Sequence, residues 1–207
     1  MKKQLLAVIS SVALIAGGTS AFGQAQVVFA NNGSTLLSIS NQTTHVSSLM
    51  FGPAGTFDIG LYMGASGATD ISQMQLVDLA TSPNAPTSSF FTAGSFSGGT
   101  VATPGNVANT INFQAGTQYA FIVAAWSAAD GSTYAAALAS GDANGYTGLS
   151  ALGFVTPLAP PSGAPNTFGT AAGQVGGFTL VTPVPEPTTL ALGGLGAAAL
   201  LMFRRRK

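Results

Sequence analysis

The sequence predicts an all-β protein: a β-sandwich or jelly-roll-like domain, flanked by an N-terminal signal peptide and a C-terminal apolar helix. Between residues 26 and 182, apolar residues fall in short runs separated by Gly, Pro, Asn and Asp, a pattern typical of consecutive short strands. This region has no convincing amphipathic helix. About nine or ten short strands favour a sandwich or jelly roll over a barrel.

The clearest strand is expected at QYAFIVAAW, which ends at Trp126. Because successive side chains of a strand point to opposite faces, Tyr119 and Phe121 would share one face, and Ile122 and Trp126 the other. Further strands are expected over residues 35–40, 56–63, 74–79, 90–96, 110–113, 133–138, 149–154 and 178–181.

The chain between the strands at 118–126 and 133–138 contains the pair Asp130-Gly131. Glycine readily adopts positive φ, so this pair predicts a hairpin turn. The alanines between Ala135 and Ser140 leave a short helical turn as the alternative.

The N-terminus has the three parts of a secretory signal peptide, assigned to residues 1–25. A basic start, MKK, precedes an apolar run and then small residues. The run is shorter than the roughly 20 residues that cross a bilayer, so an uncleaved anchor is the weaker alternative. Cleavage is expected after Ala25, with Ala21 or Gly23 as alternatives, because signal peptidase accepts small side chains at its subsites.

The C-terminal segment, residues 183–207, also has three parts. Pro185, Glu186 and Pro187 come first, and the two prolines hold this motif extended before any helix can begin. An apolar stretch, residues 188–203, follows. As a helix it would be roughly 24 Å long, somewhat short of a bilayer core of about 30 Å.

Four consecutive cations end the chain: Arg204, Arg205, Arg206 and Lys207. Such a cluster resists translocation, so it would stay cytoplasmic and place the preceding domain outside the inner membrane. A plain transmembrane anchor with an accidental Pro-Glu-Pro is the alternative interpretation.

The last 25 residues resemble the PEP-CTERM sorting domain of Gram-negative bacteria that make extracellular polysaccharide. The resemblance implies that the membrane enzyme exosortase recognises Pro185, Glu186 and Pro187 and processes the tail. Signal peptidase, the Sec machinery and, transiently, the inner membrane would be partners. The destination would be the cell surface or the extracellular matrix, with exopolysaccharide as a candidate partner there.

The middle of the chain also resembles a loosely related set of uncharacterised PEP-CTERM proteins. The shared pieces are AQVVFANN, FIVAAWSAADGSTYAAA and a final Phe-Thr-Leu after a Pro/Gly-rich loop. This resemblance implies a β-sandwich domain at residues 26–182 and no particular activity.

All six basic residues lie at the two ends, and none occurs between Gln4 and Phe203. Nucleic-acid binding is therefore excluded, because it depends on Lys and Arg that neutralise phosphates. With no cysteine, the chain forms no disulfide.

The sequence predicts no enzyme, no catalytic residue, no cofactor and no metal. His45 is the one histidine, lies in a polar stretch, and is expected in a solvated loop or edge strand. Asp58 and Asp70 are too far apart in sequence to be argued as a glycosidase pair. Gly141–Gly145 faintly resembles a calcium loop but lacks the later acidic ligands, so a turn is expected.

A binding function remains open, because aromatic side chains can stack on sugar rings. Candidates are Trp126, Tyr62, Tyr119, Tyr134 and Tyr146, although Trp126 is expected in the core. The leading hypothesis is a structural or adhesive protein of an exopolysaccharide layer. The alternatives are a carbohydrate-binding module at the cell surface and, more weakly, a hydrolase with an unrecognised carboxylate site.

Overall fold

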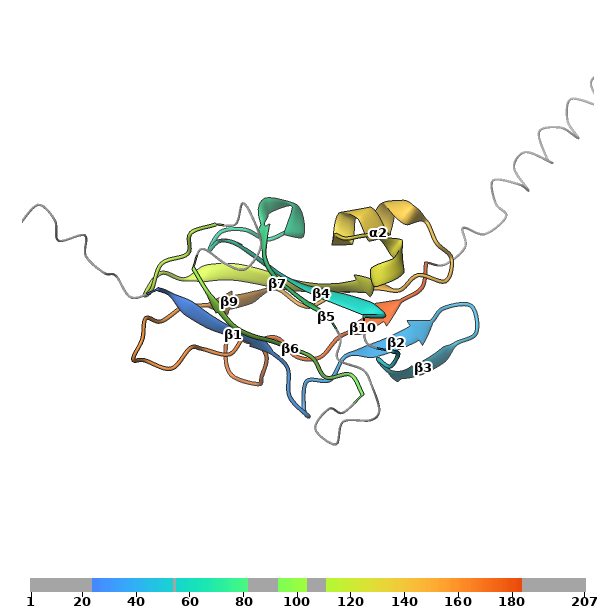
Figure 1. The fold of residues 1–207 in the computed structure, drawn as a ribbon, viewed down its shortest axis with the longest axis horizontal. Coiled ribbons are helices and arrows are strands. Elements are labelled where there is room, and N and C mark those ends of the chain that lie inside the picture. Colours follow the sequence, from blue (N-terminus) through green and yellow to red (C-terminus); the bar gives the residue numbers. More distant parts are fainter. Residues whose placement is uncertain (1–23, 54, 82–92, 104–110, 184–207) are drawn as a thin grey trace, which may run out of the picture.

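A computed structural model describes residues 24–53, 55–81, 93–103 and 111–183, which form a mostly β structure with one short α-helix (Figure 1). The strands are β1 (Gln26–Ala30), β2 (Ser38–Asn41), β3 (Val46–Leu49), β4 (Phe57–Ala65), β5 (Gln75–Thr81), β6 (Ser97–Ala102), β7 (Tyr119–Ser127), β8 (Thr147–Leu149), β9 (Gly153–Val155) and β10 (Thr179–Val181). The helices are the 3-10 turns η1 (Ile71–Gln73) and η2 (Ala128–Asp130) and the α-helix α2 (Tyr134–Ser140).

The strands form two sheets. β1 and β6 pair in the smaller sheet, and the larger sheet has the order β3-β2-β10-β8-β7-β4-β5, with β9 also paired to β7. β10 and β2 run parallel, and the other pairs are antiparallel. At the centre, β4 and β7 pair along nine residues each.

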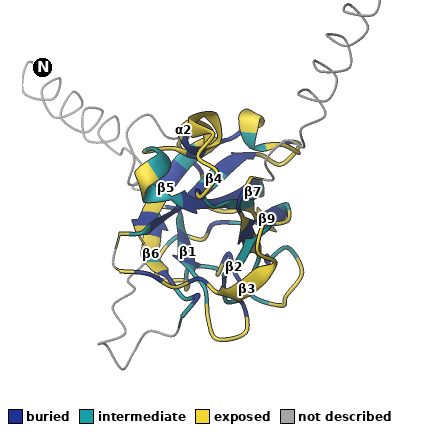
Figure 2. Cartoon of the chain, turned by 90° about the vertical axis from the view of Figure 1, so that its right-hand side faces the viewer, coloured by how far each residue is buried: buried dark blue, intermediate teal, exposed yellow. Residues whose placement is uncertain are grey.

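β7 is buried on both faces, as its sequence predicts. Phe121 and Tyr119 face the main core, which β1 and β6 close from the other side. Ile122 and Trp126 belong to two smaller clusters on the opposite face, beside η1 and α2 respectively. Figure 2 shows the central strands β4 and β7 in the colour of buried residues. The prediction of alternating faces is confirmed.

The predicted strand at 133–138 and the hairpin at Asp130-Gly131 are wrong. η2 and α2 occupy this region, which confirms the helical alternative. The Thr133 side chain accepts a hydrogen bond from the Ala136 N–H (3.1 Å) and caps the helix start. Gly141, with a φ of 64°, ends the helix in the left-handed conformation that glycine favours.

One expected strand, 149–154, is split in two. Ser150 lies between β8 and β9, and its hydroxyl accepts a hydrogen bond from the Val123 N–H (2.9 Å). The Ser150 N–H in turn donates to the Val123 carbonyl (2.8 Å). The serine thus takes a place in the β7 ladder and interrupts the regular strand.

Other strand predictions are shifted or wrong. β2 begins at Ser38 rather than at 35, and β6 begins at Ser97, beyond the expected 90–96. Gly94 adopts a φ of 82° in a turn, which prevents an earlier start. Residues 111–113 are not a strand, and β1 and β3 are missing from the predictions. Residues 90–92 and 110 lie outside the described part of the chain.

Within the described residues, no helix is long and apolar enough to cross a membrane. The C-terminal helix expected at 188–203 lies outside them, as does the signal peptide apart from residues 24 and 25.

Candidate functional site

An open hollow of about 490 Å³ lies at one end of the larger sheet, where β4 begins and β7 ends. We call it the end hollow. One part of its lining is apolar and includes Ile39 and Phe51; another part carries Asp130, Asp142 and Asn144. It therefore combines an apolar wall with a carboxylate and amide rim.

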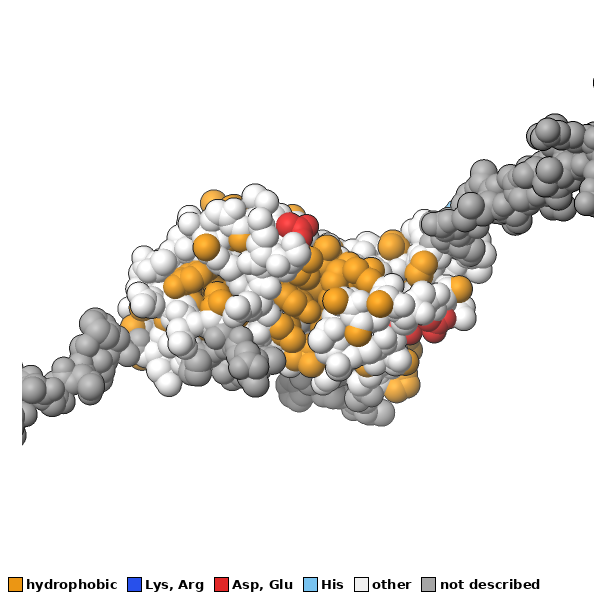
Figure 3. All heavy atoms as spheres, turned by 90° about the horizontal axis from the view of Figure 1, so that it is seen from above, with side chains coloured by type: hydrophobic (Ala, Val, Ile, Leu, Met, Phe, Trp, Pro, Cys, Tyr) orange, Lys and Arg blue, Asp and Glu red, His pale blue; other side chains and the backbone are white. Residues whose placement is uncertain are grey.

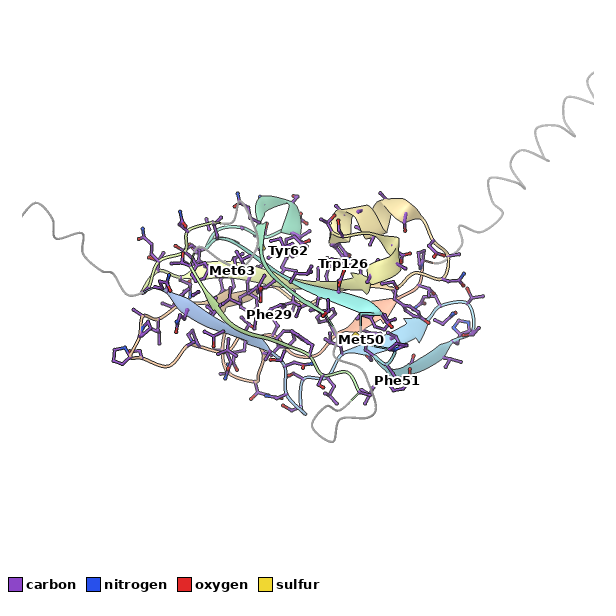
Figure 4. All side chains as sticks on the ribbon, viewed as in Figure 1. Phe29, Met50, Phe51, Tyr62, Met63 and Trp126 are labelled. Atoms are coloured by element: carbon purple, nitrogen blue, oxygen red, sulfur yellow. The ribbon has the colours of Figure 1, made fainter. Side chains whose placement is uncertain are left out.

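The apolar wall is built from aromatic rings that extend outward from the core. Phe57, at the start of β4, is 2 % exposed, and its ring meets that of Tyr146 edge to face, with centroids 6.2 Å apart. Phe51 follows the fully buried Met50 but is itself 55 % exposed. Figure 4 labels Met50 and Phe51, which lie beyond the end of β3. The wall thus presents a large aromatic side chain to solvent directly after a buried core residue.

The ends of the two helices on this side of the sheet place the carboxylates of the rim. Asp130 ends η2, and the Trp126 Nε1–H donates to the carbonyl of the next residue, Gly131 (2.8 Å). Asp142 directly follows the glycine that ends α2. The Asp130 carboxylate lies against Gly145, where any side chain larger than hydrogen would overlap it.

The two carboxylates of the rim interact with each other. Burial raises the pKa of Asp130, and the charge of Asp142 and a hydrogen bond with it raise this pKa further. The chain has no lysine or arginine between Gln4 and Phe203 that could offset this repulsion. The rim is therefore a locally negative, acceptor-rich surface.

The loop before β8 confirms the expected turn. The Asn144 N–H donates to Asp142 Oδ1 (2.9 Å), and the Gly145 N–H donates to the Asp142 carbonyl (3.1 Å). No group of three or more His, Cys, Asp or Glu residues that could hold a metal occurs among the described residues.

The five aromatic residues that the sequence suggests for sugar stacking lie in different parts of the structure. Trp126 is fully buried and Tyr134 is 9 % exposed, so the core interpretation of Trp126 is confirmed. Tyr119 is half-buried, and its hydroxyl accepts a hydrogen bond from the Gln114 N–H (3.0 Å). Tyr62 lies on the α2 face, and Tyr146 is the one candidate of the five that lines the end hollow.

Sequence reasoning missed Phe51. It follows Met50 immediately and precedes Gly-Pro, so the alternation of side chains could have shown one apolar residue facing inward and the other outward. No local pattern indicates that residue 51 would line the same hollow as residues 130 and 142, because this proximity depends on tertiary packing.

The other polar candidates serve local structure. His45 lies in the exposed turn between β2 and β3, with a φ of 56°. Asp70 caps η1 by accepting from the Ser72 N–H (2.8 Å), which lowers its pKa. Asp58, 9 % exposed on β4, pairs in register with Trp126, and burial raises the pKa of its carboxyl.

A second surface lies on the α2 face. Figure 3 looks down on this face and shows apolar side chains gathered in a strip over the sheet. Tyr62 and Ile71 are partly buried there. A side chain at Gly60 would collide with Leu76 and Tyr62, so glycine permits their close packing.

The predicted sorting residues and the basic stop lie outside the described part of the chain. Ala25, the predicted cleavage position, is described: it is 1 % exposed and belongs to the main core. Its carbonyl accepts a hydrogen bond from the Thr103 N–H (2.9 Å).

The fold and the terminal pattern define the class of an exported, mostly β protein. More particularly, the family model of the PEP-CTERM protein-sorting motif matches residues 183–207. The chain thus carries this motif at its C-terminus, which implies export, processing by exosortase and association with the cell surface. No curated protein and no solved structure matches the chain.

Proposed function

We propose that the domain at residues 26–182 is a non-enzymatic structural or adhesive component of an exopolysaccharide layer. The Sec machinery would export it, the tail would hold it in the inner membrane for a time, and exosortase would then release or transfer it. The observation that carries this proposal is the sorting motif at residues 183–207. The confinement of every basic residue to the two ends supports it.

The parts of the tail have separate functions in this proposal. Pro185, Glu186 and Pro187 are the recognition residues, the apolar stretch enters the bilayer, and the cations at 204–207 stop translocation. Once the tail is removed, the domain would carry acidic residues and no lysine or arginine. No segment of the released domain would then be suited to hold it at an anionic membrane surface.

We also propose that the domain is a small β-sandwich, in which β1 and β6 form the smaller of the two layers. Residues of both sheets contribute to one core, which supports this description. Residues 1–25 would form the signal peptide, with cleavage after Ala25 as the prediction made from the sequence. The packing of Ala25 in the core supports the earlier alternatives, Ala21 and Gly23, because they would keep its contacts in the mature domain.

The non-enzymatic assignment is also a proposal. Its support is that two of the acidic side chains have structural functions and that the one histidine lies away from them in an exposed turn. Asp70 caps a 3-10 helix, Asp142 closes a turn, and His45 lies in an exposed hairpin turn.

One observation favours a second function, that of a carbohydrate-binding module. Phe51 and Tyr146 line the same hollow as Asp130, Asp142 and Asn144. Aromatic rings together with hydrogen-bonding groups suit the apolar face and the hydroxyl groups of a sugar ring.

Substituting the motif tests the proposed sorting. In a host with exosortase, we expect Pro185→Ala, Glu186→Ala and Pro187→Ala, combined, to leave the protein in the inner-membrane fraction, because the recognition residues are gone. Pro165→Ala, a proline outside the matched residues 183–207, is the matched control and should reach the surface normally. If the triple variant reached the surface at the wild-type level, the proposed sorting function would be wrong.

A further inference from the structure

We infer that the end hollow binds one uncharged pyranose ring of a polysaccharide, which stacks on Phe51 and donates hydroxyl hydrogen bonds to Asp142 and Asn144. This inference rests on the proposed surface function and gives it a ligand class. It assigns the contact with polysaccharide to one end of the larger sheet.

The size and depth of the end hollow suit a small ring. Its volume of about 490 Å³ lies within the range of roughly 300–1,000 Å³ that small-molecule sites occupy. Because the hollow is open to solvent, a ring within a longer chain could enter without threading its ends.

The two sides of the hollow match the two kinds of surface on a pyranose. Such a ring has a face of C–H groups and a periphery of hydroxyls. Phe51, 55 % exposed, offers a flat apolar surface whose covering is favourable because it removes apolar area from water. In the same lining, carboxylate oxygens accept hydrogen bonds from hydroxyls, and the Asn144 amide can donate and accept.

The negative charge of the end hollow determines which sugars can bind there. Asp130 and Asp142 both line the hollow, and the described residues contain no lysine or arginine to pair with an acidic sugar. A uronate or sulfated ring would add a third negative group and be repelled. Neutral hydroxyls instead donate to the two carboxylates and ease the mutual repulsion that contributes to the raised pKa of Asp130.

The site is held in place before any ligand arrives. The Tyr146 N–H donates to Ser127 Oγ (2.8 Å), and the Ser127 N–H donates to the Tyr146 carbonyl (2.9 Å), which joins the loop to the end of β7. The Trp126 bond to Gly131 fixes the chain beyond Asp130. A preformed site loses less conformational entropy on binding.

Affinity electrophoresis of the full-length protein in mild detergent tests the inference. The gels contain a neutral glucan, a neutral mannan, the anionic polymer alginate, or no polymer. We expect retardation in at least one neutral polymer and none in alginate. Phe51→Ala should weaken this retardation by about 10-fold or more, the effect of losing an aromatic anchor.

Leu138→Ala is the matched control, because Leu138 on α2 is also 55 % exposed and does not line the hollow. It should retain binding within about 2-fold, a difference of under 1 kcal/mol. Asp142→Asn tests the polar rim independently and should also weaken binding. Urea unfolding of each variant shows that a loss of binding is not a loss of fold.

Three outcomes would overturn the inference: no retardation by either neutral polymer, retardation by alginate alone, or neutral binding that neither Phe51→Ala nor Asp142→Asn weakens. None of these would change the surface location of the protein. Failure of the sorting experiment, in contrast, would leave the binding result standing, so the two failures can be distinguished.

Discussion

At the scale of single residues, Gly131 determines how the chain leaves η2. Its φ is 147°, and a Cβ there would lie 2.7 Å from the Ala136 Cβ. Gly131→Ala should therefore lower the free energy of unfolding by about 1–3 kcal/mol, measured by urea denaturation. Gly33→Ala is the control, because a Cβ at residue 33 would have no neighbouring atom within 4 Å and the backbone there is not left-handed. Equal effects of the two substitutions would contradict the account.

Asp130 gives a prediction about pH. Burial and Asp142 raise its pKa in the folded protein above the ordinary 3.8. As pH rises, the Asp130 carboxyl of the unfolded chain therefore loses its proton at a lower pH than that of the folded protein. Ionisation above about pH 4 then costs stability. Asp130→Asn should stabilise the protein at pH 7 by under about 1 kcal/mol, since the group is partly solvated, and have no such effect at pH 3.

Asp70 is the control of opposite sign. Hydrogen bonds from Ser72 lower its pKa, so its charged form adds stability above the ordinary pKa and this contribution is lost as pH falls. Asp70→Asn should destabilise at pH 7 and have little effect at pH 3. If both variants showed the same change at both pH values, charge would not be the cause.

At the scale of elements, α2 depends on its first and last residues. Thr133 accepts the Ala136 N–H at the helix start. Thr133→Ala should cost about 1 kcal/mol of stability in urea unfolding, the usual effect of losing an N-cap. Ser132→Ala, an exposed neighbour outside the cap bond, should be nearly neutral. A neutral result for Thr133→Ala would mean that the cap is unimportant.

The elements also show what sequence could and could not predict. β7 is predictable because its side chains alternate between the main core and the two smaller clusters on the opposite face. The strand predicted at 133–138 is a helix, because Thr133, four alanines and Gly141 form a capped helical segment that outweighs the hairpin signal of Asp130-Gly131. The division at Ser150 depends on a bond to β7, 27 residues away in the chain, which local patterning does not reveal.

The candidate site also has features that the sequence predicts and features that it does not. The sequence predicts Tyr146 as a candidate because tyrosine suits sugar stacking, and the residue types around Asp142 predict the turn. Phe51 lines the same hollow although β2 and β10 separate β3 from β8 in the larger sheet, so this proximity is a result of tertiary packing. Residue types were therefore predictable, whereas their convergence was not.

At the scale of the whole molecule, charge and fold are separated. The two ends carry every lysine and arginine of the chain. The middle carries only acidic charges and forms a β domain with an apolar core. The segments that we propose are removed by processing thus contain every lysine and arginine of the chain. The domain left behind depends on core packing and backbone hydrogen bonding, since the chain has no cysteine.

The central claim is that the tail directs the domain to the cell surface and is then removed. Intact-mass spectrometry of protein collected from the surface of an exosortase-containing host tests this claim most directly. The predicted mass lacks the apolar stretch and the cations at residues 188–207, and the same protein in an exosortase deletion strain keeps them. Surface protein whose mass includes residues 188–207 in the host with exosortase would contradict the account.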